Sequence, residues 1–403
     1  MNVFNSDVHK QFYIDGVQEE NRDAVPMRYV SDIQTDNAEY LYNRYGSDMT
    51  AQNSTDSTYT TPDFTYSADS KLIDLEAIAA DRITYKELQR QGFDIVADRK
   101  DKHAYAIAKA VHRNAARQTR VLASDSIDNL DVSGSGSVGD LITASSSNAD
   151  DIAATAVQFL QESNAFTERN PYAMMSPKQA RAFNLFSMGA GFSTADKALM
   201  NGIFTVAGGT RIIRGAMPFA GLDVVVTNET PKYAVYTLAA NLTAADTVTV
   251  NGVVFTVVAS PSAAGDVDLG ASAEVTIDNL VAAINGGSGA GTAYVAVSSA
   301  NRAILDAAGV KARKLTAATM EVESFTTLTV AEAGAQSSWS SVVDPILVGA
   351  YGSTTIALPS AGANVVEKEP SLFSGVELMF SQIHDATVWT KDAPKIKRIL
   401  TAA

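Results

Sequence analysis

The sequence of 403 residues contains no cysteine and no long hydrophobic run. The lack of cysteine excludes disulfides, thiolate zinc sites, iron–sulfur clusters and a catalytic cysteine. No stretch approaches the roughly 18 consecutive apolar residues that a transmembrane helix needs. The N-terminal segment has neither a basic region nor an apolar run, so we expect no signal peptide. We therefore expect no membrane contact, and a fold stabilised by apolar burial within the chain or between copies.

Basic residues are outnumbered by acidic ones, and the net charge is −14. An acidic chain repels the phosphate backbone, which disfavours specific DNA recognition, although a local basic patch could contact DNA. Hydrophobic residues make up 46% of the sequence, which is typical of a globular protein. The length predicts two or three domains, or one large domain with an insertion.

The sequence has little that could carry catalysis. His103 and His112 point to opposite sides of a helix, and the other two histidines are distant in the chain. Gly134, Gly136 and Gly139 have the spacing of a dinucleotide-binding loop, but no apolar strand precedes them and no helix follows directly. We therefore expect no enzyme activity, no metal site and no cofactor, and we expect residues 125–148 to form a mobile loop.

Residues 1–63 are polar and lack a periodic apolar pattern, so this segment cannot bury a core of its own. It nevertheless contains aromatic residues, among them Phe12, Tyr13, Tyr40 and Tyr42. A fully solvated tail has little use for such side chains. We therefore expect an extended arm that becomes ordered against a neighbour, with a flexible tail as the alternative.

Two periodic segments follow the arm. Residues 64–84 partly alternate between apolar and polar, which favours a hairpin or a long projecting loop over a short helix around Asp74–Ala80. The next segment, to about Ser124, has a helical period, with an apolar stripe and a basic face that we expect to be solvated or paired with another subunit. The stripe contains Ala104, Ile107, Ala108, Val111, Ala115 and Leu122, and the basic face contains Arg99, Lys100, Lys102, Lys109, Arg113, Arg117 and Arg120.

Strands and helices alternate in the rest of the chain. Asn148 is expected to cap one helix, and Ser176 with Pro177 to begin another after a short strand. Residues 240–333 have the pattern of a self-contained β-β-α-β insertion. Its expected elements are the hairpin Thr247–Val258 with an Asn251-Gly252 turn, the helix Ala273–Asn285, and the strands Ala293–Ser298 and Ser324–Val330.

The order of these elements, together with two short motifs, resembles the major capsid proteins of tailed bacteriophages, which have the HK97-type fold. The motifs are YAMMSPKQARAFNLF and LMNGIFTVAGGTRIIRGAMPFAGLDVVVTN, and the matching positions are Met174–Pro177, Gly202, Gly215 and Gly221–Asn228. The resemblance covers most of 60–235 and, more loosely, 340–400. The segment 240–333 separately resembles a small module inserted in phage capsid and tail proteins.

This resemblance implies an α+β, HK97-like fold with an inserted β-rich domain. The implied parts are an extended N-terminal arm at 1–63, a projecting E-loop at 64–84, a peripheral domain with a long spine helix at 85–235, and an axial domain with a return to the peripheral domain at 236–400, interrupted by the inserted domain at 240–333.

The resemblance also implies a structural protein rather than an enzyme. Pentamers and hexamers of the chain would form the icosahedral head shell of a virion around double-stranded DNA, after assembly in the host cytoplasm. The implied partners are a separate scaffolding protein, a portal, a decoration protein as an optional partner, and packaged DNA contacted non-specifically. The side chains expected at inter-subunit contacts are Phe12, Tyr13, Tyr40, Tyr42, Lys71, Arg113 and Arg117.

Two other assignments stay open. An encapsulin-like compartment shell shares the fold, but the long arm and the inserted domain argue against it. A phage tail-tube or decoration protein also carries modules like 240–333, but a β-rich tube has no place for the long helix.

Overall fold

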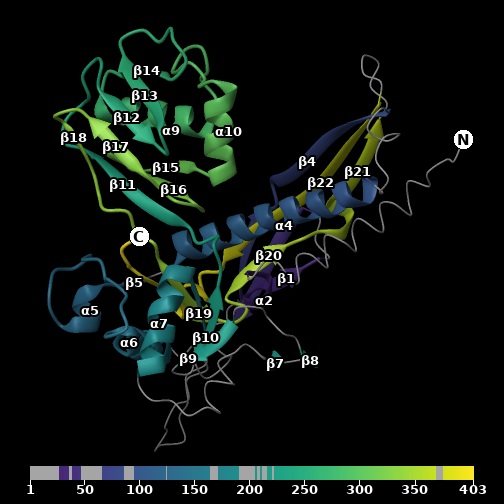
Figure 1. Ribbon diagram of the computed structural model, residues 1–403, viewed down its shortest axis with the longest axis vertical. Helices are drawn as coiled ribbons and strands as arrows, with labels where there is room; N and C mark the ends of the chain where they lie inside the picture. The colour runs from purple at the N-terminus through teal and green to yellow at the C-terminus, as the bar shows by residue number, and fades with distance from the viewer. Residues whose placement is uncertain are drawn as a thin grey trace, which may run out of the picture. The chain divides into compact units, whose positions relative to one another are not determined.

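The computed structural model describes residues 27–35, 39–46, 66–85, 95–123, 125–163, 171–189, 205–206, 209–210, 216–219, 222–368 and 375–403. The chain divides into two compact units. Unit 1 comprises Met1–Ser124 and Ala350–Ile396, and unit 2 comprises Asp125–Gly349 and Lys397–Ala403. The architecture is α+β, as predicted (Figure 1). The predicted segment 85–235 extends over parts of both units.

Unit 1 combines a five-stranded sheet with one long helix. Its helical elements are α2 (Met27–Val30), α4 (Ile95–Leu122), η1 (Ser360–Gly362) and η2 (Ala393–Lys395). The strand order is β1-β20-β22-β21, with β4 also paired to β22, and α4 packs on β22 and β4 (Figure 1). These strands are β1 (Asp32–Gln34), β4 (Leu75–Thr84), β20 (Thr354–Ala357), β21 (Ala363–Lys368) and β22 (Gly375–Val388).

The long helix confirms most of the predicted apolar stripe. All its predicted members except Leu122 are buried. Two positions were predicted wrongly, because Leu122 is 38% exposed and Arg120, expected on the basic face, is fully buried. The C-terminal half of α4 is buried on several sides, as the burial of Asn114 and Thr119 shows. A pattern with one apolar stripe does not anticipate that environment.

The alternation in 64–84 produces two strands, so a short helix at that place is excluded. The strands do not pair with each other. Instead β3 (Tyr66–Leu72) pairs with β2 (Tyr40–Gly46), and β4 pairs with β22. The predicted arm thus supplies one strand of a two-stranded ribbon, β2–β3, and supplies β1 to the main sheet.

Unit 2 contains a sheet domain and the inserted domain. The sheet domain has a six-stranded sheet in the order β5-β23-β19-β6-β10-β9, and a separate pair β7–β8. Its helices are α5 (Asn129–Ser133), α6 (Ala149–Glu162) and α7 (Pro177–Gly189). Its strands are β5 (Asp125–Ile127), β6 (Pro171–Met175), β7 (Thr205–Val206), β8 (Gly209–Thr210), β9 (Ala216–Phe219), β10 (Leu222–Val226), β19 (Ile346–Ala350) and β23 (Ile396–Ile399).

Local signals set the starts of two helices here. Pro177 begins α7, as predicted, and the N–H of Ser176 donates to the Gln179 side chain (2.7 Å). This is half of a capping box. Asn148 precedes α6, as predicted, but its side chain accepts hydrogen bonds from Ser145 and does not cap the helix.

The segment 125–148, predicted as a loop, contains β5, α5 and a hydrogen-bonded turn. Asp128 caps α5 and accepts a hydrogen bond from the N–H of Gly139 at 2.6 Å. Gly136 has φ 107°, and a Cβ there would lie 2.8 Å from the Asp140 carboxylate. The glycines therefore serve a close turn, which gives the spacing a structural explanation.

The inserted domain comprises residues 232–342. It is wider than the predicted 240–333 because β11 (Lys232–Leu238) and β18 (Ser337–Trp339) join it. Two four-stranded sheets, β15-β16-β11-β18 and β14-β13-β12-β17, share one apolar core, and α9 contacts strands of both (Figure 1). The remaining elements are β12 (Thr247–Val250), β13 (Val253–Val258), β14 (Asp266–Asp268), β15 (Lys311–Thr316), β16 (Thr319–Ser324), β17 (Val330–Ala333), α9 (Ala273–Asn285) and α10 (Ser299–Ala308).

Several predictions for this domain are confirmed. The hairpin turn lies at Asn251-Gly252, with φ values of 49° and 80° that suit a type I′ turn, and α9 has the predicted bounds. Two strand predictions were wrong. In the described chain, 293–298 forms isolated bridges at Tyr294, and 325–329 is a connection between β16 and β17. A short run of Ala, Val and Thr occurs in strands and in loops alike, so this composition does not distinguish the two.

Candidate functional site

The residues predicted at inter-subunit contacts fall into three groups. Phe12 and Tyr13 lie outside the described residues. Tyr40, Tyr42 and Lys71 lie on the ribbon β2–β3, and Tyr40 is half-buried. Arg113 and Arg117 lie one turn apart on α4. Gly202, Gly215 and Gly221 of the motif match also lie outside the described residues. For the aromatic and basic residues of the three groups, contact with another subunit stays a prediction.

Lys71 is held inside unit 1. Its Nζ lies 2.9 Å from Oδ1 of Asp385 on β22 and donates to the carbonyl of Ala386 at 2.7 Å. Asp385 is 1% exposed, and the same Oδ1 accepts from the Asn114 side chain on α4 at 3.3 Å. One buried carboxylate therefore joins the ribbon, the sheet and the helix. Asp385 and Asn114 were not predicted as site residues, although an aspartate inside the run before Val388 was a usable signal.

An apolar cluster lies at the base of the ribbon. Leu41 and Ile73 are buried there with Ala357 and Trp389. The Trp389 indole also donates to the hydroxyl of Thr355 at 2.8 Å. Trp389 is thus part of the unit 1 core.

The basic face of α4 concentrates positive charge. Arg113 and Arg117 are half-buried, and Arg120 is fully buried. Burial, and then the neighbouring charges of Arg120 and Arg113, lower the pKa of Arg117 to about 10. Such a cluster favours acidic partners, and pairing of this face with another subunit stays a prediction.

Three of the four histidines are buried in unit 1. The His103 ring lies 4.9 Å from the Phe380 ring, and burial lowers its pKa, with Asp81 acting in the opposite direction. Burial also lowers the pKa of His384. His112 Nδ1 accepts a hydrogen bond from the N–H of Met27 at 3.4 Å. Among the described residues, no group of three or more His, Asp or Glu side chains is placed to hold a metal ion.

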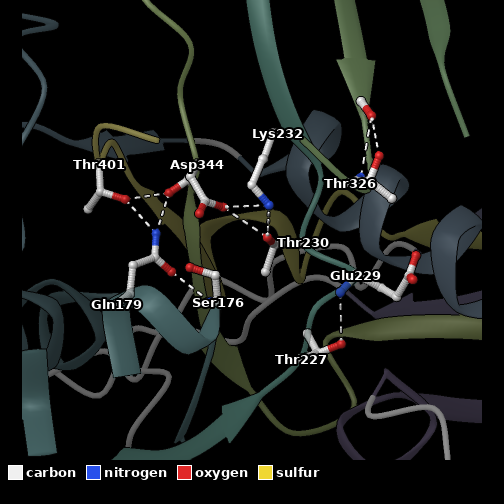
Figure 2. Close-up of polar contacts among 10 residues, drawn as sticks. Ser176, Gln179, Thr227, Glu229, Thr230, Lys232, Thr326, Asp344 and Thr401 are labelled. Atoms are coloured by element: carbon white, nitrogen blue, oxygen red, sulfur yellow. Dashed lines mark hydrogen bonds and ion pairs between the residues drawn. The ribbon is translucent and has the colours of Figure 1, made fainter. Parts of the chain in front are cut away.

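A second buried polar cluster lies where the chain enters and leaves the inserted domain (Figure 2). Asp344 is 2% exposed, and its Oδ1 accepts from the Thr230 hydroxyl at 2.8 Å and lies 3.8 Å from Lys232 Nζ. The Asp344 carbonyl accepts from the Gln179 side chain at 2.5 Å and from the Thr401 hydroxyl. This cluster therefore joins the start of α7, the two segments that connect the inserted domain to the sheet domain, and the C-terminal residues.

The backbone reinforces this junction. Tyr233 and Val343 exchange two hydrogen bonds, of 2.9 and 2.8 Å, and Val343 also bridges Ala402. Gln179 was detectable from sequence, since a glutamine three residues after a capping serine is a capping-box pattern. Asp344 and Thr401 gave no signal, because their partners are distant in sequence.

The comparisons with known proteins concern the fold. No family model and no curated protein matches the chain. The capsid of Ralstonia phage GP4 has a TM-score of 0.50 and 10% identity, with 93% of this chain and 87% of that chain covered. The capsid of cyanophage P-SCSP1u has a TM-score of 0.46 and 11% identity, covering 94% and 89% of the two chains. A structure from Mycobacterium phage Che8 has a TM-score of 0.46 and 8% identity, covering 90% and 85%.

The alignment with the Ralstonia phage protein shows that the chain has the fold of a phage capsid protein, as the resemblance implied. None of the helices within the described ranges is both long and apolar enough to cross a membrane.

Proposed function

We propose that the chain is the major capsid protein of a tailed bacteriophage or a related particle. It acts as a structural protein without catalytic activity, and its copies form the pentamers and hexamers of an icosahedral shell around double-stranded DNA. The observation that carries this proposal is the fold shared with the capsid of Ralstonia phage GP4 over 93% of this chain. A fold alone is compatible with several functions, but here the shared region includes nearly the whole chain.

The two units have different roles in this proposal. Unit 1 is the peripheral domain, α4 is its spine helix, and the sheet domain of unit 2 is the axial domain of an HK97-type protein. The ribbon β2–β3 takes the role of the E-loop, which moves the strands of that element from the predicted 64–84 to Tyr40–Gly46 and Tyr66–Leu72. The inserted domain is a surface addition to the axial domain.

The proposed contacts are tyrosines of the ribbon and the basic face of α4. Tyr40 and Tyr42 on the ribbon and Arg113 and Arg117 on α4 contact adjacent subunits. The net charge of −14 keeps packaged DNA from adhering to the wall, so DNA contacts are non-specific. A separate scaffolding protein and a portal act during assembly in the host cytoplasm, the shell becomes part of the virion, and a decoration protein is an optional partner.

Negative-stain electron microscopy of the purified chain, with and without a candidate scaffolding protein, tests this proposal. Closed shells, or pentameric and hexameric rings, are the expected result. Straight tubes would instead support a tail-tube protein. A monomer at high concentration in the presence of the scaffolding protein would contradict the proposal. Shells that enclose protein cargo in the producing cell and no DNA would support the encapsulin-like alternative.

A further inference from the structure

The carboxylate of Asp385 is bonded unevenly. Its Oδ1 accepts from Lys71 Nζ (2.9 Å), Asn114 Nδ2 (3.3 Å) and the backbone N–H of Ala386 (2.6 Å). Its Oδ2 is buried and has no hydrogen-bond partner among the described residues. The carboxylate therefore has three donors on one side, and only one of them, Lys71, carries a charge.

The ribbon needs an anchor. Its strands pair with each other from Tyr40↔Leu72 to Gly46↔Tyr66, and in the described chain neither pairs with a third strand. A two-stranded ribbon is marginally stable by itself in water. The ribbon separates from the main sheet of unit 1 at Ile73–Asp74, where the chain changes from pairing with β2 to pairing with β22.

Two contacts hold the base of the ribbon. The first is the apolar cluster that contains Leu41 and Ile73. The second is the ion pair of Lys71, which lies directly across the ribbon from Leu41. A buried carboxylate retains a charged partner strongly, because separation leaves a charge in a low-dielectric environment.

The ion pair is nevertheless able to open. The Lys71 side chain is 29% exposed, so it lies at the edge of the buried site and not within the core. When Lys71 leaves, Asp385 keeps the donors from Asn114 and Ala386. The contact thus combines a strong closed state with an open state in which the carboxylate is still hydrogen-bonded.

We propose that Lys71 and Asp385 form a latch that holds the ribbon β2–β3 against β22 of its own chain, and that the ribbon swings about Ile73–Asp74 when the latch opens. The purpose of this latch rests on the proposed function, since an unlatched ribbon gains freedom to reach a neighbouring subunit during assembly. The latch itself is a property of the single chain.

Hydrogen exchange of backbone amides in the full, unassembled chain tests the latch. Lys71→Met removes the amine and keeps most of the apolar stem. We expect exchange in β2 and β3 to rise by about tenfold or more, while exchange in α9 and β16 of the inserted domain stays at the wild-type level. Lys314→Met is the matched control, because Lys314 also pairs with carboxylates, Glu274 and Asp278, but on the surface of the inserted domain. It should leave ribbon exchange unchanged.

A second variant separates the latch from simple destabilisation. Lys71→Met with Asp385→Asn removes both charges, so no unpaired buried charge is left. Faster exchange confined to the ribbon in this double variant supports the latch. Ribbon exchange within about twofold of the wild type in both variants would overturn it and leave the apolar cluster as the anchor. A failure to form shells would contradict the proposed function without changing this result, since exchange is measured before assembly.

Discussion

The inserted domain and unit 1 are stabilised in different ways. The inserted domain has one continuous apolar core, in which Phe255, Leu280 and Met320 are fully buried. Unit 1 buries polar side chains from α4 and β22, among them His103, His112, Asn114, Thr119, His384 and Asp385. An apolar core needs mainly volume and pattern, whereas buried polar groups need particular partners. The first is therefore suited to transfer between proteins, and the second to a fixed geometry.

The largest expected difference comes from breaking the long helix. Val111→Pro removes a backbone hydrogen bond in the middle of α4 and should cost about 3 kcal/mol or more, enough to unfold unit 1. The inserted domain should keep its fold. Circular dichroism and hydrogen exchange of the full chain measure both. Val111→Ala is the control, because it keeps the helix and loses only the burial of two methyl groups, at a cost of about 2 kcal/mol. An unchanged melting curve for the proline variant would contradict the helix.

The reverse experiment targets the apolar core. Phe255 is fully buried in β13, and Phe255→Ala should destabilise the inserted domain by about 3–5 kcal/mol. Val254, its neighbour on the same strand, is 47% exposed, so Val254→Ala should change stability by less than about 0.5 kcal/mol. Calorimetry measures the transitions, and hydrogen exchange assigns them. Equal effects of the two variants would contradict the assigned core.

The polar cluster around Asp344 should show an effect of intermediate size. Asp344→Ala removes the acceptor of the Thr230 hydroxyl and the carboxylate near Lys232, at a cost of about 1–3 kcal/mol. Limited proteolysis should then cut 227–231 or 340–345 faster, with fragments that match the inserted domain. Ser341→Ala, at an exposed site nearby, should leave the rate unchanged. Wild-type cleavage rates for the aspartate variant would show that the backbone pairing alone holds the junction.

Acid should separate the two regions further. Burial lowers the pKa of His103 and His384, so below about pH 6.5 the unfolded state binds more protons than the folded state. Their contribution to stability is complete above about pH 6.5 and is lost as the pH falls through the folded pKa. Unit 1 should melt several degrees lower at about pH 5.5 than at pH 7, while the inserted domain, which has no histidine, changes little.

The histidine variants check this explanation. His384→Gln should reduce the acid-induced drop in the melting temperature of unit 1, because one titrating group is removed. Parallel losses of stability in both regions would contradict the assignment to these histidines.

The smallest effect concerns one strained residue. Ala245 has φ 78°, a left-handed conformation that costs a residue with a Cβ about 1–2 kcal/mol. Ala245→Gly removes this conformational cost, but glycine loses more backbone entropy on folding, which offsets part of the stabilisation. The variant should therefore stabilise the inserted domain by about 0.5 kcal/mol. A small rise in its denaturation midpoint is expected. Ala244→Gly, beside it, should lower the midpoint.

The parts of the fold that were predictable depend on local signals. The periodicity around Val111, the Asn251-Gly252 turn and the apolar pattern of α9 are each contained within a short stretch of sequence. The partners of strands are not local, so β3 was assigned to the wrong partner and the edges of the inserted domain were missed. Buried polar residues failed for the same reason. Arg120 looks like a surface residue in the sequence, and Asp385 gains its role from Lys71, which lies 314 positions away.

The pairing of Tyr233 with Val343 has a consequence for the design of insertions. The two segments that connect the inserted domain to the sheet domain are hydrogen-bonded neighbours. An inserted sequence of any size can therefore occupy this position if its two ends lie side by side. The ends of strands β10 and β19 then keep the same spacing whether the inserted domain is present, exchanged or replaced by a tight turn. We therefore expect that a foreign domain with adjacent ends can be inserted at this position without redesign of the sheet that carries it.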